Sequence, residues 1–225
     1  MINIKKKIDR IDTEHIEEFK DIPPSDYGHQ LHYNLISLRK IKPVVQVKDR
    51  FAGQAITVRI TPNDSILVYK AIEIARPGDV LVIDMNGEDR YACWGEITTL
   101  AAKAKGIVAS VINGAATDSL AIEENGYPVY AKSISPMTTK IYSHAGDINV
   151  PISIDGVVIH PGDLVVGDND GLLVIPQAEM DSYLEIGRDE FNKDAERKEA
   201  LTHQTIEDYL TNVNQALDGV EINWL

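Results

Sequence analysis

Between Asp26 and Pro176, closely spaced glycines and prolines cut the chain into short apolar runs, and this spacing limits the folds that it can adopt. Short apolar runs bounded by turn residues are typical of strands. The stretches 65–75 and 96–105 instead carry apolar residues at helical spacing, which predicts two helices. The predicted strands are 54–60, 80–84, 107–112, 129–131, 157–159, 164–166 and 172–175.

The order of these elements predicts an α/β fold with a mixed sheet. Helices alternate with strands up to Asn149, and beyond it short strands follow one another through Asp155-Gly156 and Asp170-Gly171, which suit hairpin turns. Pro77-Gly78 and Pro161-Gly162 each precede a predicted strand. Proline followed by glycine suits the two central positions of a type II turn, so we expect such turns there.

Two polar segments flank this core. Residues 1–22 carry Ile8, Ile11, His15 and Phe19 at intervals of three or four, which predicts a short amphipathic helix in an N-terminal arm. The core spans 23–176, and 177–225 is predicted to be a C-terminal helical extension with two apolar stripes. These stripes either pack against the body of the protein or form a contact between subunits. They consist of Met180, Leu184, Gly187 and Phe191, and of Ile206, Leu210, Val213 and Leu217.

The charge of the chain argues against several kinds of partner. There are 22 lysines and arginines against 35 aspartates and glutamates, a net charge of -13. Nucleic acids and anionic membranes call for the opposite sign. The apolar runs are far shorter than the about 18 residues of a membrane span, and no signal peptide is visible. The single cysteine, Cys93, cannot form an internal disulfide and reads as a small core residue. We therefore expect a cytoplasmic protein that binds neither nucleic acid nor membrane.

One candidate site follows the predicted strand 80–84. The segment 86–95 leads into a predicted helix that begins near Glu96. The first amides of a helix lack intrahelical acceptors and lie at the positive end of its dipole, so those near Gly95, Glu96, Ile97 and Thr98 can bind a substrate carboxylate. Gly95 would let the ligand come close. The same residues also fit an ordinary helix start, in which Glu96 only complements the dipole.

A second candidate site lies where the predicted strand 107–112 reaches Asn113-Gly114. Asp118 follows, just before a helical segment at 119–125. Ligands of open α/β sheets gather at the carboxyl ends of strands, and both candidate stretches lie at such ends. Mg²⁺ takes one or two protein carboxylates and keeps several waters, so Asp118 suits it as a ligand. Asp118 also suits the N-cap of the following helix, since aspartate is among the best capping residues.

A series of short segments, in a fixed order between Pro24 and Pro176, carries a family resemblance. The segments are Ala52-Gly-Gln-Ala-Ile-Thr-Val58, Pro77-Gly-Asp-Val-Leu-Val-Ile-Asp84, Trp94-Gly-Glu-Ile97, Ala101-Ala-Lys-Ala-Lys-Gly106, Asn113-Gly-Ala115, Tyr127-Pro-Val-Tyr-Ala131, Asn149-Val-Pro151 and the run 161–176. With them the chain resembles the family that includes class II pyruvate aldolases acting on 4-hydroxy-4-methyl-2-oxoglutarate and the regulator of ribonuclease E activity. The resemblance implies an α/β/β/α swivelling sandwich, like that of phosphohistidine domains. It also implies trimers or hexamers with the site at a subunit interface.

The resemblance also assigns site residues. Its aldolases have an acidic residue or glycine, then an Arg-Asp pair, then a further acidic residue. Glu96 stands at the first place, and Asp118 matches the metal ligand. Thr117 replaces the arginine that holds the keto acid, and Ala121 replaces the last acidic residue. Losing an oxyanion donor typically costs about 10² to 10³ in rate, and threonine cannot replace a bidentate guanidinium. Arg90 is a nearby cation that could substitute, although it also fits a surface ion pair within 88–90.

Together these features predict a lyase, dependent on Mg²⁺ or Mn²⁺, that acts on a short 2-keto acid. It would release pyruvate by aldol cleavage or decarboxylate oxaloacetate, since both reactions pass through the pyruvate enolate that a metal stabilises. Asp118 would hold the metal and Arg90 or Thr117 the keto oxygen, while Glu96 would orient a metal-bound water. We expect a homo-oligomer, a trimer or hexamer. The alternative is a non-catalytic regulatory binding protein, which the departures at Thr117 and Ala121 favour.

Overall fold

The long strand β4 (Phe51–Ile60) joins two parts of one mixed sheet in the computed structural model, which describes residues 1–37 and 39–223. Its first half pairs antiparallel with β12 (Leu164–Asp168). Its second half pairs in parallel with β5 (Val80–Asp84) and antiparallel with β9 (Gly146–Ile148). Because both of its faces are covered, β4 is buried at every residue except Arg59 rather than at alternate residues. The sheet runs in the order β2-β13-β12-β4-β5-β7-β8-β3.

The other described strands complete this sheet and a separate hairpin. The hairpin, β10–β11, turns at Asp155-Gly156, where both residues have positive φ (50° and 85°), so the predicted hairpin turn is confirmed. Gly78 and Gly162 also have positive φ (87° and 95°), as a type II turn requires. Besides β4, β5, β9 and β12, the structure describes the strands β1 (Ile2–Ile4), β2 (Leu35–Ser37), β3 (Lys42–Pro43), β6 (Ala92–Trp94), β7 (Ala109–Ala116), β8 (Val129–Ile134), β10 (Ile152–Ile154), β11 (Val157–Ile159) and β13 (Gly171–Ile175).

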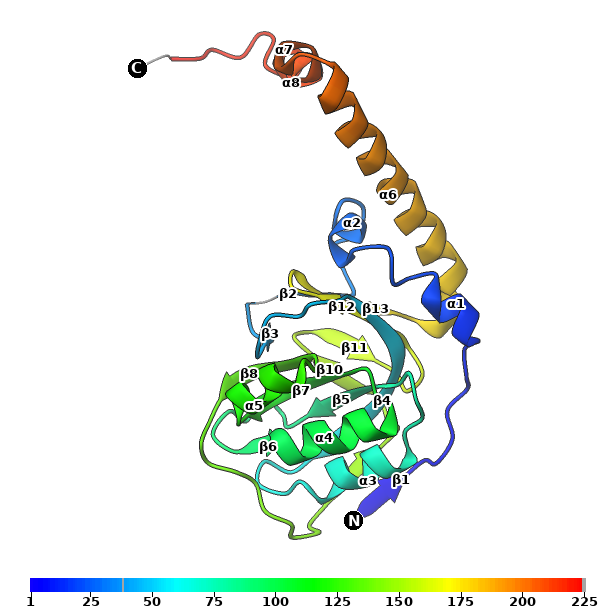
Figure 1. Cartoon of the computed structure of the whole chain (residues 1–225), viewed down its shortest axis with the longest axis vertical. Coiled ribbons are helices and arrows are strands. Elements are labelled where there is room, and N and C mark those ends of the chain that lie inside the picture. The colour runs from blue at the N-terminus through cyan, green and yellow to red at the C-terminus, as the bar shows by residue number, and fades with distance from the viewer. Residues whose placement is uncertain (38, 224–225) are drawn as a thin grey trace.

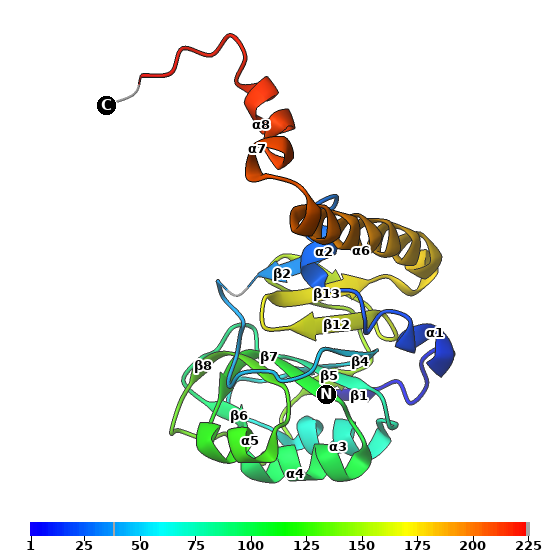
Figure 2. The same ribbon diagram turned by 45° about the horizontal axis from the view of Figure 1, so that its top comes forward.

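Three helices cover one face of the parallel strands. They are α3 (Ile66–Ile74), α4 (Glu96–Lys105) and α5 (Ser119–Asn125), and each lies in a crossover between successive parallel strands of the set β4, β5, β7 and β8. Figures 1 and 2 show the three side by side along one end of the molecule. Helix α4 ends at Gly106, whose φ of +80° is the left-handed cap that suits glycine. This arrangement brings the carboxyl ends of the parallel strands to one edge of the sheet.

The layers follow the predicted α/β/β/α order. After α3–α5 come the strands around β5 and β7, then β12 and β13, and finally α2 (Pro24–Gly28) and α6 (Met180–His203), as Figures 1 and 2 show. Three buried apolar clusters fill the space between these layers. The expected mixed α/β fold with helices at the C-terminus is confirmed.

The N-terminal segment differs in part from the predicted helical arm. Helix α1 spans only Thr13–Glu17, so Ile8 and Ile11 precede it, and Asp12 caps it by accepting from the Glu14 amide at 3.1 Å. The unpredicted strand β1 lies at the start, where its backbone pairs in parallel with β9. Phe19 is fully buried in the cluster beneath α6. The segment is therefore packed along the body.

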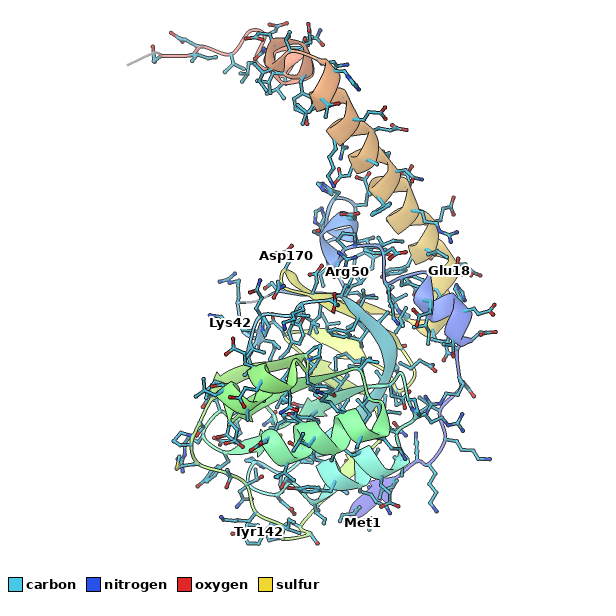
Figure 3. The ribbon with its side chains drawn as sticks, viewed as in Figure 1. Met1, Glu18, Lys42, Arg50, Tyr142 and Asp170 are labelled. Carbon is cyan, nitrogen blue, oxygen red and sulfur yellow. The ribbon has the colours of Figure 1, made fainter. Side chains whose placement is uncertain are left out.

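The first C-terminal apolar stripe is mostly buried against the body, and the second is mostly exposed. Met180, Leu184 and Gly187 of α6 are buried against the body, and a Cβ on Gly187 would lie 2.4 Å from the Tyr27 hydroxyl oxygen. Phe191 is exposed, because α6 then leaves the body (Figure 1). Glu18, labelled in Figure 3, pairs with Arg188 where α6 begins to diverge. The second stripe falls on α7 (Ile206–Tyr209), α8 (Thr211–Ala216) and Leu217, where Ile206, Val213 and Leu217 are exposed. Among residues 1–37 and 39–223, no helix is both long and apolar enough to cross a membrane.

Candidate functional site

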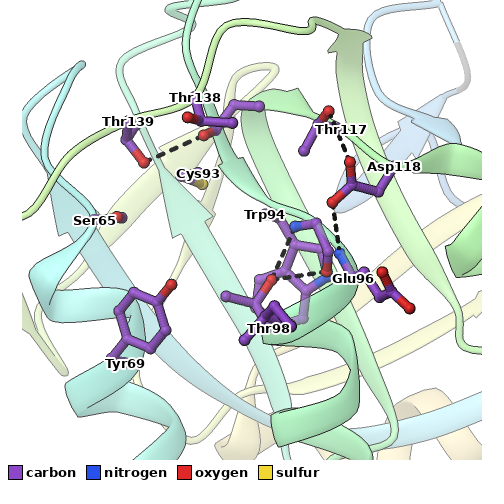
Figure 4. A pocket seen from close by; sticks show the side chains of 13 residues that line it. Ser65, Tyr69, Cys93, Trp94, Glu96, Thr98, Thr117, Asp118, Thr138 and Thr139 are labelled. Carbon is purple, nitrogen blue, oxygen red and sulfur yellow. Dashed lines mark hydrogen bonds between the residues drawn. The ribbon is translucent and has the colours of Figure 1, made fainter.

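A cavity of about 240 Å³ opens beside the carboxyl ends of β6 and β7 (Figure 4). It is smaller than the about 300–1,000 Å³ of sites for drug-sized ligands, and so suits a small metabolite. The structure brings two separate stretches of the sequence together here, one at the start of α4 and one after β7. The predicted site residues that line it are Gly95, Glu96, Ile97, Thr98, Thr117 and Asp118.

Asp118 joins these two stretches. Its Oδ2 accepts a hydrogen bond from the Glu96 amide at 3.0 Å, and its Oδ1 accepts one from the Thr117 hydroxyl at 3.3 Å. Although Asp118 stands at the N-cap position of α5, its side chain does not cap that helix, so the capping alternative is not what the structure shows. Its backbone lies in the left-handed region (φ +54°, ψ +42°), whereas N-caps are normally extended. This conformation costs about 1 kcal/mol or more, and such strain is concentrated at functional sites.

Gly95 makes room for the Asp118 carboxylate. A Cβ on Gly95 would lie 2.5 Å from Asp118 Oδ2 and 2.8 Å from Thr117 Cγ2. The backbone of Gly95 is extended (φ −160°), so the requirement for glycine is steric rather than conformational. Glycine is therefore needed here for the approach of Asp118.

The amides at the start of α4 are only partly engaged. The Gly95 amide donates to the Thr98 hydroxyl at 2.9 Å, and the Glu96 amide donates to Asp118. Within the described parts of the chain, the amides of Ile97 and Thr98 have no acceptor. They lie at the positive end of the helix dipole, so an anion can bind to them. The cradle predicted from the sequence is thus reduced to two available amides.

Trp94 forms the rigid floor beside this helix start. Its side chain is almost fully buried, and its indole Nε1 donates to the Thr99 hydroxyl at 2.9 Å. Its ring stacks on that of Tyr127 at 6.2 Å. These contacts fix the junction of β6 and α4 before any ligand arrives.

The opposite wall of the cavity comes from residues that the sequence analysis did not select. They are Ser65, Tyr69, Thr138 and Thr139. The loop that carries the two threonines is held by the buried Asp64, whose carboxylate accepts from the amides of Tyr142 and His144 at 3.1 and 2.8 Å. Burial alone would raise the pKa of Asp64, but backbone amide donors outweigh it and lower the pKa. No motif marks this wall, because the contact spans about 80 residues of sequence.

Arg90 lies outside the cavity, whereas Cys93 lines it but is buried. Arg90 does not line the cavity; its guanidinium donates to the Tyr91 hydroxyl at 3.1 Å and lies 5.2 Å from the centre of that ring. Cys93 does line it, but its side chain is 4% exposed, and burial raises the pKa of the thiol to about 12. The thiol is therefore neutral near pH 7 and packs as a small core residue, as expected.

The donor set fits a magnesium-like ion rather than a zinc-like one. In the chain apart from residues 38, 224 and 225, no group of three or more histidine, cysteine, aspartate or glutamate side chains is placed to hold a metal. Mg²⁺ and Mn²⁺ need fewer protein ligands, because waters and substrate oxygens complete their coordination. The Asp118 Oδ1, whose contact with the Thr117 hydroxyl is long, has a lone pair free for such an ion.

Comparisons with known proteins show the family of the chain. A family model described as "RraA-like: Aldolase/RraA" matches residues 25–174. A protein of Halalkalibacterium halodurans, provisionally named 4-hydroxy-4-methyl-2-oxoglutarate aldolase, is 35% identical over 187 residues, which cover 83% of this chain and 88% of that one. An uncharacterized protein from Pseudomonas syringae has a TM-score of 0.75 at 25% identity, covering 90% of this chain and 99% of the other. The RNA-processing inhibitor RraA from Thermus thermophilus has a TM-score of 0.58 at 30% identity, covering 63% and 84%. The chain therefore belongs to the RraA-like family.

Proposed function

We propose that this protein is a divalent-metal-dependent lyase that releases pyruvate from a short 2-keto acid, by aldol cleavage or by decarboxylation of oxaloacetate. One observation carries the proposal. The carboxylate of Asp118, held in a strained backbone conformation, lies at the start of α4 inside a small cavity, next to two amides that lack acceptors. A relative that covers most of the chain carries an aldolase name, which supports a lyase.

Each residue of the site has a separate role in the proposed reaction. The amides of Ile97 and Thr98 bind the carboxylate of the keto acid, where the helix dipole favours negative charge. Asp118 holds Mg²⁺ or Mn²⁺, which as a Lewis acid supplies stabilisation of the negative charge that develops on the keto oxygen. The Thr117 hydroxyl donates its one proton to Asp118 Oδ1 in the free protein, and it would turn that proton to the keto oxygen when the substrate and the ion are bound. The proposal gives Arg90 no role, because it does not line the cavity.

Proton transfer falls to Glu96 in this scheme. Its carboxylate is exposed at the cavity rim, one residue beyond the glycine that Asp118 overlies. In aldol cleavage it accepts the proton of the substrate hydroxyl, directly or through a water. It then returns a proton to the methylene carbon of the enolate, which gives pyruvate.

The test is the exchange of pyruvate methyl protons in D₂O, followed by ¹H NMR with Mg²⁺ or Mn²⁺ present, together with pyruvate release from oxaloacetate. Both reactions need only the enolate chemistry. Asp118→Asn should lower both by at least about 100-fold, since metal-assisted charge stabilisation is worth several kcal/mol. Asp181→Asn, a change at a fully solvated carboxylate on α6, is the matched control and should change neither. If the folded wild-type protein gives neither reaction with added metal, the catalytic proposal fails and a regulatory binding role is favoured, as Thr117 in the arginine position suggests.

A homo-oligomer, a trimer or hexamer, is also proposed. Large apolar side chains are exposed on the elements that border the cavity, and a second copy of the chain would bury them. Light scattering coupled to size exclusion should therefore report a mass several times that of one 24.9 kDa chain. A monomer would contradict the proposal. These side chains are Ile97, Leu100, Leu120, Ile134 and Met137, which are 44–75% exposed.

A further inference from the structure

The cavity has two chemically different walls (Figure 4). On one side lies the carboxylate of Asp118, with the exposed Glu96 at the rim, where its carboxylate points away from the hydroxyl groups in Figure 4. On the other lie the hydroxyl groups of Tyr69 and Ser65 on or beside α3, and those of Thr138 and Thr139 on the loop after β8. The proposed function uses only the first wall, so the second is free to recognise the part of the substrate that leaves as the aldehyde.

Of the four hydroxyls of the second wall, those of Tyr69 and Thr138 are available to a ligand, because the other two donate to backbone carbonyls. The Ser65 hydroxyl donates to the carbonyl of Lys140 at 3.4 Å, and the Thr139 hydroxyl donates to the carbonyl of Ala92 at 3.2 Å. Among the residues that the structure describes, the hydroxyls of Tyr69 and Thr138 have no hydrogen-bond partner. Tyr69 is 41% exposed, and Figure 4 shows its hydroxyl pointing toward the cavity. Each of these two groups can both donate and accept a hydrogen bond.

This wall is rigid before a ligand binds. The Ser65 amide donates to the Lys140 carbonyl at 2.9 Å, and the Lys140 amide donates to the Asn63 carbonyl at 2.9 Å. The buried Asp64 holds the other end of the loop through two further amides. The loop therefore lies against α3 in one position, and the spacing between the two walls is set by the fold.

The charge balance of the cavity disfavours a second substrate carboxylate. Glu96 and Asp118 already contribute two negative charges, and the keto acid brings a third through its own carboxylate. A divalent ion offsets two of these. A further carboxylate at the far end of the substrate would face hydroxyls, which can donate hydrogen bonds but carry no compensating charge.

We propose that the substrate is a 4-hydroxy-2-keto acid whose far end is a neutral, hydroxylated carbon rather than a second carboxylate. This inference rests on the proposed lyase function. In the cleavage, the bond between C3 and C4 breaks, the C4 hydroxyl loses its proton and becomes an aldehyde carbonyl, and the bonding electrons pass to C3. The resulting enolate takes up a proton at C3. The products are pyruvate and a neutral hydroxyaldehyde, and Tyr69 and Thr138 bind the hydroxyl group of the latter.

Two five-carbon substrates that differ only at the terminal group test the inference. They are 4,5-dihydroxy-2-oxopentanoate, which gives pyruvate and glycolaldehyde, and 4-hydroxy-2-oxoglutarate, which gives pyruvate and glyoxylate. Pyruvate from either is followed by the ¹H NMR signal of its methyl group, with Mg²⁺ present. We expect kcat/KM to be at least 10-fold higher for the neutral substrate. Equal values, or a preference for the dicarboxylate, would overturn the inference.

Variants then locate the preference in the hydroxyl wall. Tyr69→Phe removes only the hydroxyl and should lower kcat/KM for the neutral substrate by about 2- to 10-fold, the range of one neutral hydrogen bond. Thr138→Lys places a cation in the wall and should shift the preference toward the dicarboxylate. Tyr142→Phe is the control, because Tyr142 lies on the same loop but outside the cavity lining, at the outer edge seen in Figure 3. If Tyr69→Phe and Thr138→Lys leave the ratio of kcat/KM for the two substrates unchanged, Tyr69 and Thr138 do not determine the substrate preference.

Pyruvate methyl exchange in D₂O separates the two proposals. Pyruvate has no C4, so its exchange needs only the first wall and reports the enolate chemistry separately from the choice of substrate. If exchange occurs and the dicarboxylate is preferred, the lyase function stands and the substrate inference falls. If exchange fails in folded wild-type protein, both fall.

Discussion

Replacing Gly95 with alanine is the sharpest structural test of the site. The added Cβ would lie 2.5 Å from Asp118 Oδ2, which is too close for two non-bonded heavy atoms. Because the other close neighbour is the Thr117 Cγ2 at 2.8 Å, the carboxylate and Thr117 must both move. The hydrogen bond between Asp118 and the Glu96 amide would then be lost, while the backbone conformation at residue 95 stays accessible to alanine.

The size of the effect follows from that hydrogen bond. A hydrogen bond to a charged group contributes about 1.5–3 kcal/mol, and in a chain of this length each 1 kcal/mol shifts Tm by about 2–4 °C. Gly95→Ala should therefore lower Tm by about 3–12 °C. If Asp118 must hold its position to act, the same free energy corresponds to a loss of about 10- to 150-fold in the rate of pyruvate exchange.

The assays are differential scanning calorimetry and the ¹H NMR exchange experiment with Mg²⁺. Gly28→Ala is the matched control, because the nearest heavy atom to a Cβ there is 4.0 Å away, and it should not lower Tm or change the exchange rate. A Gly95→Ala protein with the Tm and exchange rate of the wild type would refute the contact between Gly95 and Asp118 and the role built on it.

Three further changes test the surrounding structure. The lowered pKa of Asp64 contributes stability that is present above its unfolded value of about 3.9 and is lost as pH falls toward the folded value, so Asp64→Asn should flatten the decline of Tm below about pH 5. Gly187→Ala should cost about 1–3 kcal/mol in urea unfolding, because its Cβ would overlap the Tyr27 hydroxyl. The raised pKa and burial of Cys93 should make its alkylation by iodoacetamide at pH 8 much slower in native than in urea-unfolded protein, as mass spectrometry would show. A wild-type pH profile, an unchanged unfolding midpoint, or equally fast alkylation in the two states would contradict these expectations in turn.

Elements whose sequence signals are local were predictable. Helix α4 spans Glu96–Lys105, the predicted range, since its apolar period and the glycines at both ends define it. The hairpin turn was likewise predicted from two residues alone, Asp155 and Gly156. Such features depend on neighbours in sequence, and the structure confirms them.

Elements made by distant pairing were missed or misjudged. Strand β7 continues to Ala116 rather than ending at Ile112, because the Asn113-Gly114 pair, before which the predicted strand ended, lies within the strand where its pairing with β8 shifts register. A side chain at Gly114 would collide with Met85, which explains the glycine without a turn. The strands β1 and β6 have only three residues each, too few for a periodic pattern in the sequence.

The candidate site was also predictable only in part. The rule that ligands gather at strand ends brought Gly95 and Asp118 to the same edge of the sheet, and the structure places them in contact. The hydroxyl wall was not predictable, because Tyr69 and Thr138 meet only through a loop fixed by Asp64 across about 80 residues. Arg90 was selected for its charge and its closeness in sequence to Glu96, neither of which determines where its side chain lies.

The most direct measurement of the central claim is an anomalous difference map from crystals of the full chain grown with Mn²⁺ and oxalate, a mimic of the pyruvate enolate. We expect a manganese peak bonded to Asp118, with oxalate bridging from the ion to the amides of Ile97 and Thr98. A cavity without manganese, in which Asp118 still accepts only from the Glu96 amide and the Thr117 hydroxyl, would contradict it.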